Sequence, residues 1–285
     1  MKMELDDKSV RTHGLYTDQW REGPMIGKGA FGSVNLAINL TNGEIIAVKK
    51  IQADPQLPEY KKKLFALSKE IDILSHLNHP NIVQYLGSEI DEKNHVMNIL
   101  VEYVPGGSMQ SLISKFGPLS EVLVRLYTKQ ILLGLEYLHR KGIIHRDIKG
   151  ANILVDQYGR VKLSDFGAAT KIESVTTLPS ESSTSCETFT GTPYWMAPEV
   201  IKQNNYGRKC DVWSLGCTVI EMLTGQPPWS HLTPVTALFQ IASSDELPNF
   251  PTNVTLTCIQ FMSSCLVRDV AIRPTVTQLL KNQFM

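Results

Sequence analysis

The first hundred residues alternate between apolar and polar positions in the way that half-buried β-strands do. Residues 34–38 and 45–48 follow this period of two, and a Thr-Asn-Gly turn at 41–43 separates them. Between about 58 and 77 the pattern changes, and apolar residues recur every three or four positions, which predicts one amphipathic helix. We therefore expect a small β-rich unit with a single helix, beginning at Trp20.

Helical patterns dominate beyond a Gly-Gly-Ser break at 106–108. Ser120 is a candidate cap for a helix whose apolar face carries Leu123, Tyr127, Ile131, Leu135 and Leu138, and Gly142 ends it. A second apolar helix is predicted from about 211 to 223 and ends at Gly225. A larger α-rich unit therefore follows the β-rich one.

Composition excludes several classes of protein. The 285 residues are 42% apolar, and 28 Lys plus Arg balance 28 Asp plus Glu, so the chain is neither disordered nor a globally basic nucleic-acid binder. We expect no nucleic-acid partner. No apolar run approaches the roughly 18 to 20 residues that span a bilayer, and no apolar targeting segment opens the chain. We expect no membrane insertion and a cytoplasmic location, with the nucleus left open.

The cysteines predict packing rather than chemistry. Their count of five is odd and no CxxC pair occurs, which favours small buried hydrophobes in a reducing compartment over a disulfide framework. His76 and His79 suggest a zinc pair, but no third ligand follows nearby. Residues 174–192 hold 11 Ser or Thr in 19 positions, which by composition is a loop.

A glycine-rich segment introduces the first candidate chemistry. Residues 27–34, GKGAFGSV, fit the pattern G-x-G-x-x-G-x-V through Gly27, Gly29 and Gly32. Because a strand pattern rather than a helix follows, the glycines lie at a hairpin tip, where backbone N–H groups can approach phosphates. A plain turn is the alternative reading of this motif alone.

A charged pair strengthens the phosphate interpretation. Lys49 ends the sequence Ala-Val-Lys on the next predicted strand, and Glu70 lies on the predicted helix that follows. A lysine that contacts phosphates needs a partner to hold it, and Glu70 is the candidate. Either residue taken singly is typical of an ordinary surface charge.

Two further motifs carry candidate catalytic groups. Residues 145–152, HRDIKGAN, supply Asp147, which can accept or orient the proton of an attacking hydroxyl, and Asn152, which can ligate Mg²⁺. Residues 165–167, DFG, supply the Asp165 carboxylate for a metal that bridges nucleotide phosphates, and 197–199, APE, follow. The ordered set is far more specific than any member.

With these motifs in this order, the sequence resembles the protein kinase superfamily over roughly residues 20–284. The resemblance implies an α+β, bilobal kinase fold, with a small β-rich N-lobe containing one helix and a larger α-helical C-lobe. The implied boundaries are a flexible approach at 1–19, an N-lobe at about 20–101, a hinge at about 102–107 and a C-lobe at about 108–285. The implied cofactors are ATP and Mg²⁺.

The finer resemblance is to the STE group. Lys149, two residues after Asp147, is the form of serine/threonine kinases, and residues 98–108, 145–156 and 210–222 look most like mitogen-activated protein kinase kinase kinases of the MEKK-like class, including plant members. This implies ATP-dependent phosphorylation of Ser or Thr in a MAP kinase kinase within a MAPK signalling cascade. The alternatives are a STE-group kinase one tier further upstream and a pseudokinase scaffold, although pseudokinases usually lack residues of the Lys49, Asp147 or Asp165 type.

The resemblance also implies roles for single residues. Lys49 and Glu70 would hold the α- and β-phosphates, and Lys149 the γ-phosphate charge. The implied adenine pocket comprises Ile26, Val34, Ala47 and Leu154 around the base, Val101 as gatekeeper, and backbone groups of Glu102 and Val104. Leu74, Tyr85, His145 and Phe166 would form a regulatory stack. Asp211 would hold the catalytic loop, and Glu199 would pair with Arg273.

Regulation is predicted in the Ser/Thr-rich loop. Arg146 can pair with a loop phosphate, which adds about −1.5 to −2 charge, and the expected phosphosites lie within 184–190, namely Thr184, Ser185, Thr188 and Thr190. An upstream kinase, or the chain itself in trans, would act on them. Thr192 would lie beside Asp147 and Lys149 and help exclude tyrosine acceptors. Val270 and the Asn-Gln-Phe at 282–284 depart from the family pattern, with local packing effects expected.

Overall fold

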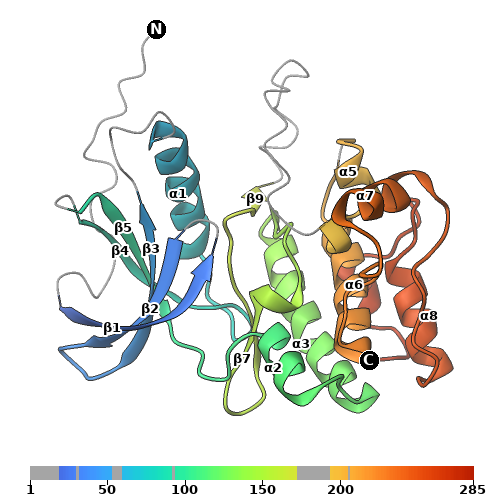
Figure 1. Cartoon of the computed structure of the whole chain (residues 1–285), viewed down its shortest axis with the longest axis horizontal. Coiled ribbons are helices and arrows are strands. Elements are labelled where there is room, and N and C mark those ends of the chain that lie inside the picture. The colour runs from blue at the N-terminus through green and yellow to red at the C-terminus, as the bar shows by residue number, and fades with distance from the viewer. Residues whose placement is uncertain (1–18, 30–31, 53–59, 92–93, 172–192, 205) are drawn as a thin grey trace, which may run out of the picture. The chain divides into compact units, whose positions relative to one another are not determined.

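A computed structural model of the chain describes residues 19–29, 32–52, 60–91, 94–171, 193–204 and 206–285 (Figure 1). Two compact units are present, and each is described by itself. The first runs to Asn78 and takes up Val83–Tyr103, and the second comprises His79–Ile82 and Val104–Met285. The chain passes between them after Tyr103, within the range expected for the hinge. Among the described residues, no helix is long and apolar enough to cross a membrane.

The first unit is an antiparallel sheet with one helix, as the sequence predicted. Its five strands lie in the order β1-β2-β3-β5-β4. Their bounds are β1 Trp20–Gly29, β2 Gly32–Asn39, β3 Ile45–Gln52, β4 Tyr85–Asp91 and β5 Val96–Glu102, and the helix is α1 Tyr60–Ser75. One face of the sheet buries a core cluster of Ala37, Ile46, Val48 and Leu100. Both faces of the inner strands are covered, since β3 buries Ile46, Ala47 and Val48 in succession and β5 buries residues 97–100.

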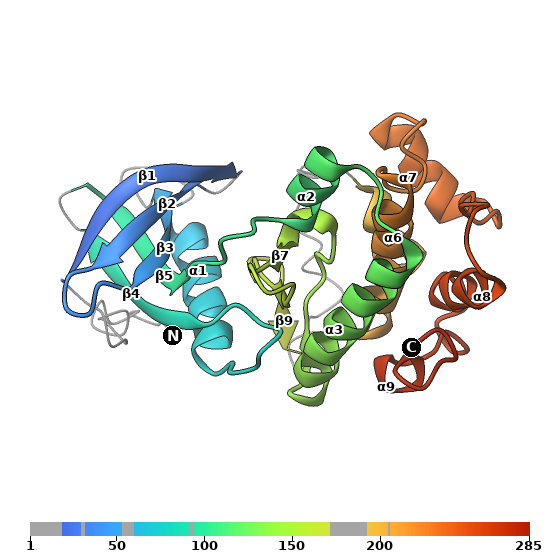
Figure 2. The same ribbon diagram turned by 90° about the horizontal axis from the view of Figure 1, so that it is seen from below.

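The second unit is mainly helical and surrounds α6. The helices are α2 Met109–Phe116, α3 Glu121–Arg140, α5 Pro198–Ile201, α6 Lys209–Thr224, α7 Pro234–Ser243, α8 Leu256–Cys265 and α9 Val276–Leu279. Two small hairpins pair β6 Ile143–Ile144 with β9 Thr170–Lys171, and β7 Ile153–Val155 with β8 Val161–Leu163. Every residue of α6 from Cys210 to Met222 is buried, and α3 and α8 pack against it (Figure 2). Polar side chains on α6 therefore lie inside the unit.

Helix ends follow the sequence signals. Gly225 ends α6 in the left-handed conformation at φ 82°, where a residue without Cβ is favoured. Ser120 occupies the N-cap position of α3, as predicted, although its side chain accepts no hydrogen bond from the first turn. Glu121 instead places a carboxylate in the first turn, where it interacts favourably with the helix dipole.

The four described cysteines are buried packing residues, as expected. Cys210, Cys217, Cys258 and Cys265 are free and buried. Burial raises the pKa of all four thiols, that of Cys258 to about 12, so they stay protonated and unreactive near neutral pH. Cys186 lies outside the described residues.

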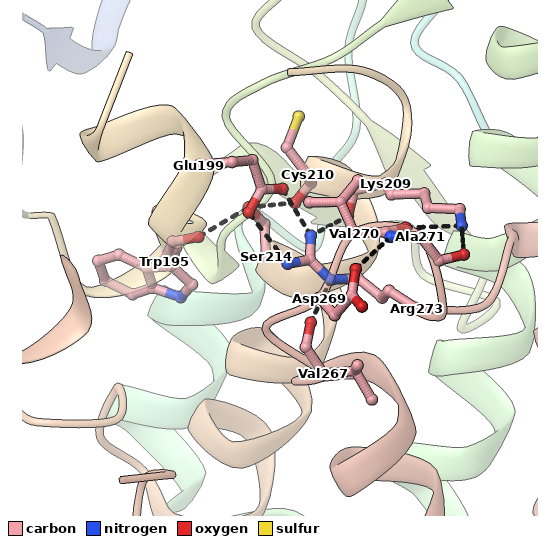
Figure 3. A network of polar contacts seen from close by, with 10 residues as sticks. All are labelled: Trp195, Glu199, Lys209, Cys210, Ser214, Val267, Asp269, Val270, Ala271 and Arg273. Carbon is pink, nitrogen blue, oxygen red and sulfur yellow. Dashed lines mark hydrogen bonds and ion pairs between the residues drawn. The ribbon is translucent and has the colours of Figure 1, made fainter. Parts of the chain in front are cut away.

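A buried ion pair joins distant segments of the second unit (Figure 3). The guanidinium of Arg273, which is 0% exposed, donates to both carboxylate oxygens of Glu199 at 2.6 and 3.0 Å. It also donates to the carbonyls of Val267 and Lys209. The predicted Glu199–Arg273 pairing is therefore confirmed. Charges taken out of water in this way are tolerated only when fully paired.

The two departures from the family pattern lie in locally packed structure. The ammonium of Lys209 donates to the carbonyls of Val270 and Ala271 at 2.7 and 2.9 Å (Figure 3). Phe284 is buried, and its ring centroid lies 5.2 Å from that of Phe261.

Removing one partner of the buried ion pair should destabilise the second unit strongly. We expect Arg273→Leu to lower the free energy of unfolding by about 3 to 5 kcal/mol, because it leaves Glu199 buried without a counter-charge. Urea denaturation followed by circular dichroism measures this. The control is Arg160→Leu, which breaks an ion pair with Asp156 whose arginine side chain is 62% exposed and should cost at most about 1 kcal/mol. Equal losses in the two variants would contradict the account.

Candidate functional site

In the first unit, Lys49 and Glu70 form an ion pair. Nζ of Lys49, on β3, lies 2.7 Å from Oε1 of Glu70, on α1, and the Glu70 side chain is 6% exposed. Because the Glu70 carboxylate is buried, it holds the Lys49 ammonium at a fixed position, whereas the ammonium of a surface lysine is mobile. The structure therefore brings these two predicted residues together.

The sheet register places three predicted adenine-pocket residues on the Lys49 face. Val34 lies opposite Lys49 on β2, and Ala47 precedes Lys49 by two positions. Val101 lies opposite Ala47 on β5. Residues opposite each other or two apart share a face, and this is not the face that buries the core cluster. The apolar side chains of Val34, Ala47 and Val101 therefore lie on the same face of the sheet as Lys49.

The remaining first-unit residues lie on β1, β2 and β5. Ile26 falls at a register shift of β1 and is 46% exposed. Gly27 pairs with Val34, and Gly29 pairs with Gly32 across the hairpin. Gly32 has φ +152°, and a Cβ there would lie 1.8 Å from the carbonyl oxygen of Lys50, so no other residue fits.

Glu102 is hydrogen-bonded to Gln84, the residue just before β4. Its N–H donates to the carbonyl of Gln84, and its carboxylate accepts from the N–H of Gln84 at 2.7 Å. In the second unit, Val104 is buried, and the neighbouring Gly107 carbonyl accepts from Val155 on β7, next to Leu154. The residues predicted for the adenine pocket belong to both units: Ile26, Val34, Ala47, Val101 and Glu102 to the first, and Val104 and Leu154 to the second.

The two predicted metal ligands lie at the open end of the β7–β8 hairpin. Ile153 pairs with Leu163, so Asn152 and Ser164 are the residues just beyond the pair. Ser164 donates through its N–H and its hydroxyl to the carbonyl of Asn152, at 2.9 and 3.0 Å. Asp165 follows in the left-handed conformation at φ 60°, which costs backbone energy and is typical of functional positions.

Asp147 lies in a cluster of polar groups. Its Oδ2 accepts from Nζ of Lys149 at 2.9 Å and from Nδ2 of Asn152 at 2.7 Å. Asn152 Nδ2 also donates to the Asp147 carbonyl. Two donors on Oδ2 orient the carboxylate so that Oδ1 can receive another donor. Since Asn152 uses its nitrogen here, its amide oxygen is the atom that can bind a cation.

These residues fit Mg²⁺ by their donor chemistry. Asp165 supplies a carboxylate and Asn152 an amide oxygen, which are the hard ligands that Mg²⁺ takes. Within the described ranges no group of three His, Cys, Asp or Glu side chains could hold a metal by itself.

The carboxylate of Asp211, on α6, holds the segment that precedes Asp147. Oδ2 accepts from the N–H of His145 at 3.0 Å, and Oδ1 accepts from the N–H of Arg146 at 2.8 Å. The ring of His139 bonds Oδ2 at 2.8 Å. Burial alone would raise the Asp211 pKa, but the hydrogen bond and the charge of His139, with the bond from the Arg146 N–H, outweigh it, so the pKa lies below its usual value. The predicted contact of Asp211 with the loop is confirmed.

The second unit holds half of the predicted regulatory stack. The rings of His145 and Phe166 lie 4.9 Å apart, whereas Leu74 and Tyr85 belong to the first unit. Nδ1 of His145 accepts from the N–H of Asp147 at 3.3 Å, so its Nε2–H donates to the carbonyl of Ser164 at 3.1 Å. His145 thus connects the Asp147 loop to the chain that carries Asp165.

The predicted regulatory residues are only partly described. Arg146 is exposed, has φ 70°, and places its guanidinium carbon 5.0 Å from the ring centroid of Tyr206. Thr184, Ser185, Thr188, Thr190 and Thr192 lie outside the described residues.

Sequence reasoning missed several residues that position this site. They are His139, Ser164, Ser214 and Glu221. Ser214 Oγ donates to the Trp195 carbonyl (Figure 3), and Glu221 accepts from Gly150. The one available signal was the occurrence of polar residues inside the otherwise apolar pattern of 211–223.

Comparison with known proteins agrees with this geometry. Residues 20–285 match the family described as "Protein kinase domain". The chain therefore belongs to the protein kinase family, which confirms the fold class expected from the resemblance.

Relatives with curated names point to one class of kinase. The chain is 45% identical over 98% of its length to "Mitogen-activated protein kinase kinase kinase A" of Dictyostelium discoideum. It is 45% identical over 94% of its length to "Mitogen-activated protein kinase kinase kinase 2" of Arabidopsis thaliana, and 44% over 93% to the human "Mitogen-activated protein kinase kinase kinase 3". The chain covers 29%, 41% and 42% of these relatives.

The pH dependence of stability tests the role of Asp211. We expect Asp211→Asn to lower the free energy of unfolding at pH 7 by roughly 1 to 3 kcal/mol, because its amide nitrogen faces one loop N–H that then lacks an acceptor. The pKa of the Asp211 carboxyl is lower in the folded protein than in the unfolded chain. The ionised carboxylate therefore stabilises the fold at pH values above the unfolded-state pKa, and this stabilisation disappears as pH falls through the folded-state pKa. The gap between wild type and variant should therefore narrow as pH falls below about 5.

Denaturant titrations at a series of pH values measure this gap. The control is Asp156→Asn, because Asp156 also accepts two backbone N–H groups, from Tyr158 and Arg160, but in a turn. A gap for Asp211→Asn that is absent at pH 7, or constant over the whole range, would contradict the account.

Proposed function

We propose that this chain transfers the γ-phosphoryl group of ATP to a Ser or Thr hydroxyl of a protein substrate. The observation that carries the proposal is the Asp147 cluster, in which Oδ2 is bound by Lys149 and Asn152 while Oδ1 can receive the substrate hydroxyl. Catalysis of this kind depends mainly on positioning and on charge stabilisation.

In the proposed reaction Asp147 orients the hydroxyl and accepts its proton. A bond forms between the hydroxyl oxygen and the γ-phosphorus, and the bond from that phosphorus to the β–γ bridging oxygen breaks. The electron pair leaves on that oxygen, so ADP is released and the substrate carries a phosphoester. Lys149, beside Asp147 at 2.9 Å, supplies positive charge for the transferring phosphoryl group.

The other site residues hold the nucleotide and its metal. Lys49, fixed by Glu70, binds the α- and β-phosphates, and Asp165 and the Asn152 amide oxygen bind Mg²⁺. Bound magnesium neutralises charge on the phosphate oxygens. The apolar residues Ile26, Val34, Ala47, Val101 and Leu154 contact the adenine, and backbone groups of Glu102 and Val104 bind its edge.

We further propose that the protein substrate is a MAP kinase kinase. The support is the printed names of the relatives, which are MAP kinase kinase kinases. Lys149 supports a Ser/Thr rather than a Tyr acceptor. We place the reaction in a cytoplasmic MAPK cascade, with an upstream kinase, or the chain itself in trans, as activator.

The assignment of Asp147 is tested by Asp147→Asn. We expect phosphorylation of protein substrate to fall by at least about 10²-fold, because the amide cannot accept the hydroxyl proton, while ATP affinity stays unchanged. Steady-state kinetics and calorimetric titration of ATP measure the two quantities. The control is Asp269→Asn, which changes an exposed aspartate. Full activity of Asp147→Asn would contradict the assignment.

The substrate tier is tested by offering purified kinases of the cascade. MAP kinase kinases and MAP kinase kinase kinases, each made catalytically inactive, are incubated with the chain and ATP, and the modified residues are mapped. We expect modification of Ser or Thr in the MAP kinase kinases. Modification confined to the kinase kinase kinases would place the chain one tier further upstream.

Phosphorylation within 184–190 is the proposed switch, with Arg146 as the residue that binds the phosphate. We expect active protein to carry phosphate there and phosphatase treatment to lower activity. Arg146→Ala should remove that difference, because the cation that pairs with the phosphate is gone. Mass spectrometry that finds no phosphate in this range on active protein would refute the switch.

A further inference from the structure

One oxygen atom of the second unit accepts hydrogen bonds from two functional segments. Oε2 of Glu221, on α6, accepts from the N–H of Gly150 at 3.0 Å and from the indole Nε1–H of Trp195 at 2.9 Å. Gly150 directly follows Lys149, and Trp195 lies in the segment just before the Ala-Pro-Glu motif. The residues lie 71 and 26 positions from Glu221 in the sequence.

The carboxyl group is deeply buried and closely packed. Glu221 is 3% exposed, and a Cβ at Gly150 would lie 2.5 Å from its Oε1. A side chain at position 150 would therefore push against the Glu221 carboxylate, and glycine lets the loop backbone lie directly beside it. Burial raises the pKa of the Glu221 carboxyl, and the bonds from Gly150 and Trp195 and the charge of Lys149 oppose that rise. A group that is costly to bury needs such partners to be tolerated.

Glu221 belongs to a buried polar row on α6. Asp211, Ser214, Thr218 and Glu221 are three or four residues apart and therefore share one helix face. Asp211 accepts the N–H groups of His145 and Arg146. Ser214 donates to the Trp195 carbonyl at 2.7 Å. Glu221 differs from both because its oxygen joins the catalytic loop and the Trp195 segment at one point.

We propose that Glu221 is a positioning residue for phosphoryl transfer, which fixes the Lys149–Gly150 peptide and the Trp195 segment relative to each other through a single shared oxygen. This inference rests on the proposed kinase function. The hydrogen bond from the Gly150 N–H fixes the backbone next to Lys149. It therefore fixes the position from which the Lys149 side chain reaches Asp147. The indole bond sets the position of the chain that follows Thr192, the residue predicted to lie beside Asp147 and Lys149.

Three substitutions separate this role from bulk packing. Glu221→Met keeps the length of the side chain and removes both acceptor oxygens. Glu221→Gln keeps one oxygen, which can take the place of Oε2 and accept from both donors. Trp195→Phe keeps a ring and removes only the indole donor. Glu246→Met is the control, because it removes an exposed carboxylate that binds Gln240.

The kinetic result should separate kcat from the KM for ATP. We expect Glu221→Met to lower kcat by about 10- to 100-fold through misplaced catalytic groups, with KM for ATP changed by less than about twofold. Glu221→Gln should keep kcat within about threefold of wild type, since one oxygen serves both donors. Trp195→Phe should lower kcat by about fivefold, which corresponds to one hydrogen bond.

A double-mutant cycle tests the shared oxygen itself. In the Glu221→Met background, Trp195→Phe should cost less than about twofold further, because its bond is already absent. Independent, multiplying effects would overturn the proposal, as would a Glu221→Gln variant as impaired as Glu221→Met. Wild-type kcat in Glu221→Met would also overturn it. If Glu221→Met does not fold, the kinetics of Glu221→Gln and Trp195→Phe decide.

A measurement without catalysis keeps this test distinct from that of the proposed function. The Trp195 indole N–H signal, assigned by its loss in Trp195→Phe, should exchange slowly with solvent in wild type and Glu221→Gln and fast in Glu221→Met. That outcome with an inactive wild-type chain would refute the kinase function and leave the contact intact. Equal exchange in all three proteins would overturn the positioning role.

Discussion

The second unit depends on a carboxylate that lies where water cannot reach it. Asp211 is 0% exposed, and its two oxygens accept the N–H groups of His145 and Arg146. Those N–H groups belong to irregular backbone, which has no ladder or helix to satisfy it. The Asp211 carboxylate supplies the hydrogen-bond acceptors that a helix or sheet would otherwise supply. By holding His145 and Arg146 it also positions the loop residues that follow, from Asp147 to Asn152.

The same solution recurs along α6 and around it. Ser214 and Glu221 present polar atoms from the same helix face to the Trp195 segment and to Gly150. Arg273 and Glu199 form a second buried charge pair that ties the Ala-Pro-Glu motif to the chain after α8. Burying any one of these polar or charged groups without a partner costs free energy, whereas a group whose hydrogen bonds are all made is tolerated. The apolar core of the second unit therefore contains a row of polar side chains on α6. The segments that carry the site residues are hydrogen-bonded to that row.

The sequence predicted the parts of this arrangement that are local or carried by motifs. Period-two and helical patterns located the β-rich unit, α1, α3 and α6, and the ordered motifs named Lys49, Glu70, Asp147, Asn152 and Asp165. The Lys49–Glu70 and Glu199–Arg273 pairs are present in the structure, whereas the roles of the site residues in catalysis stay predictions. Ser120 is the N-cap of α3 as predicted, but its hydroxyl accepts no bond there, and Glu121 supplies the charge in the first turn. The contact of Glu221 with Gly150 was not predicted, since no role was implied for Glu221 and tertiary packing brings together these residues, which are 71 positions apart.

The central claim is that buried carboxylates of α6 make the catalytic loop rigid although it lacks regular secondary structure. Amide hydrogen exchange, resolved by residue, tests this most directly at His145, Arg146 and Gly150. The account predicts that these three loop amides exchange as slowly as those in the middle of α6, because their acceptors are buried with them. Exchange as fast as that of the exposed turn at Tyr158 would contradict it.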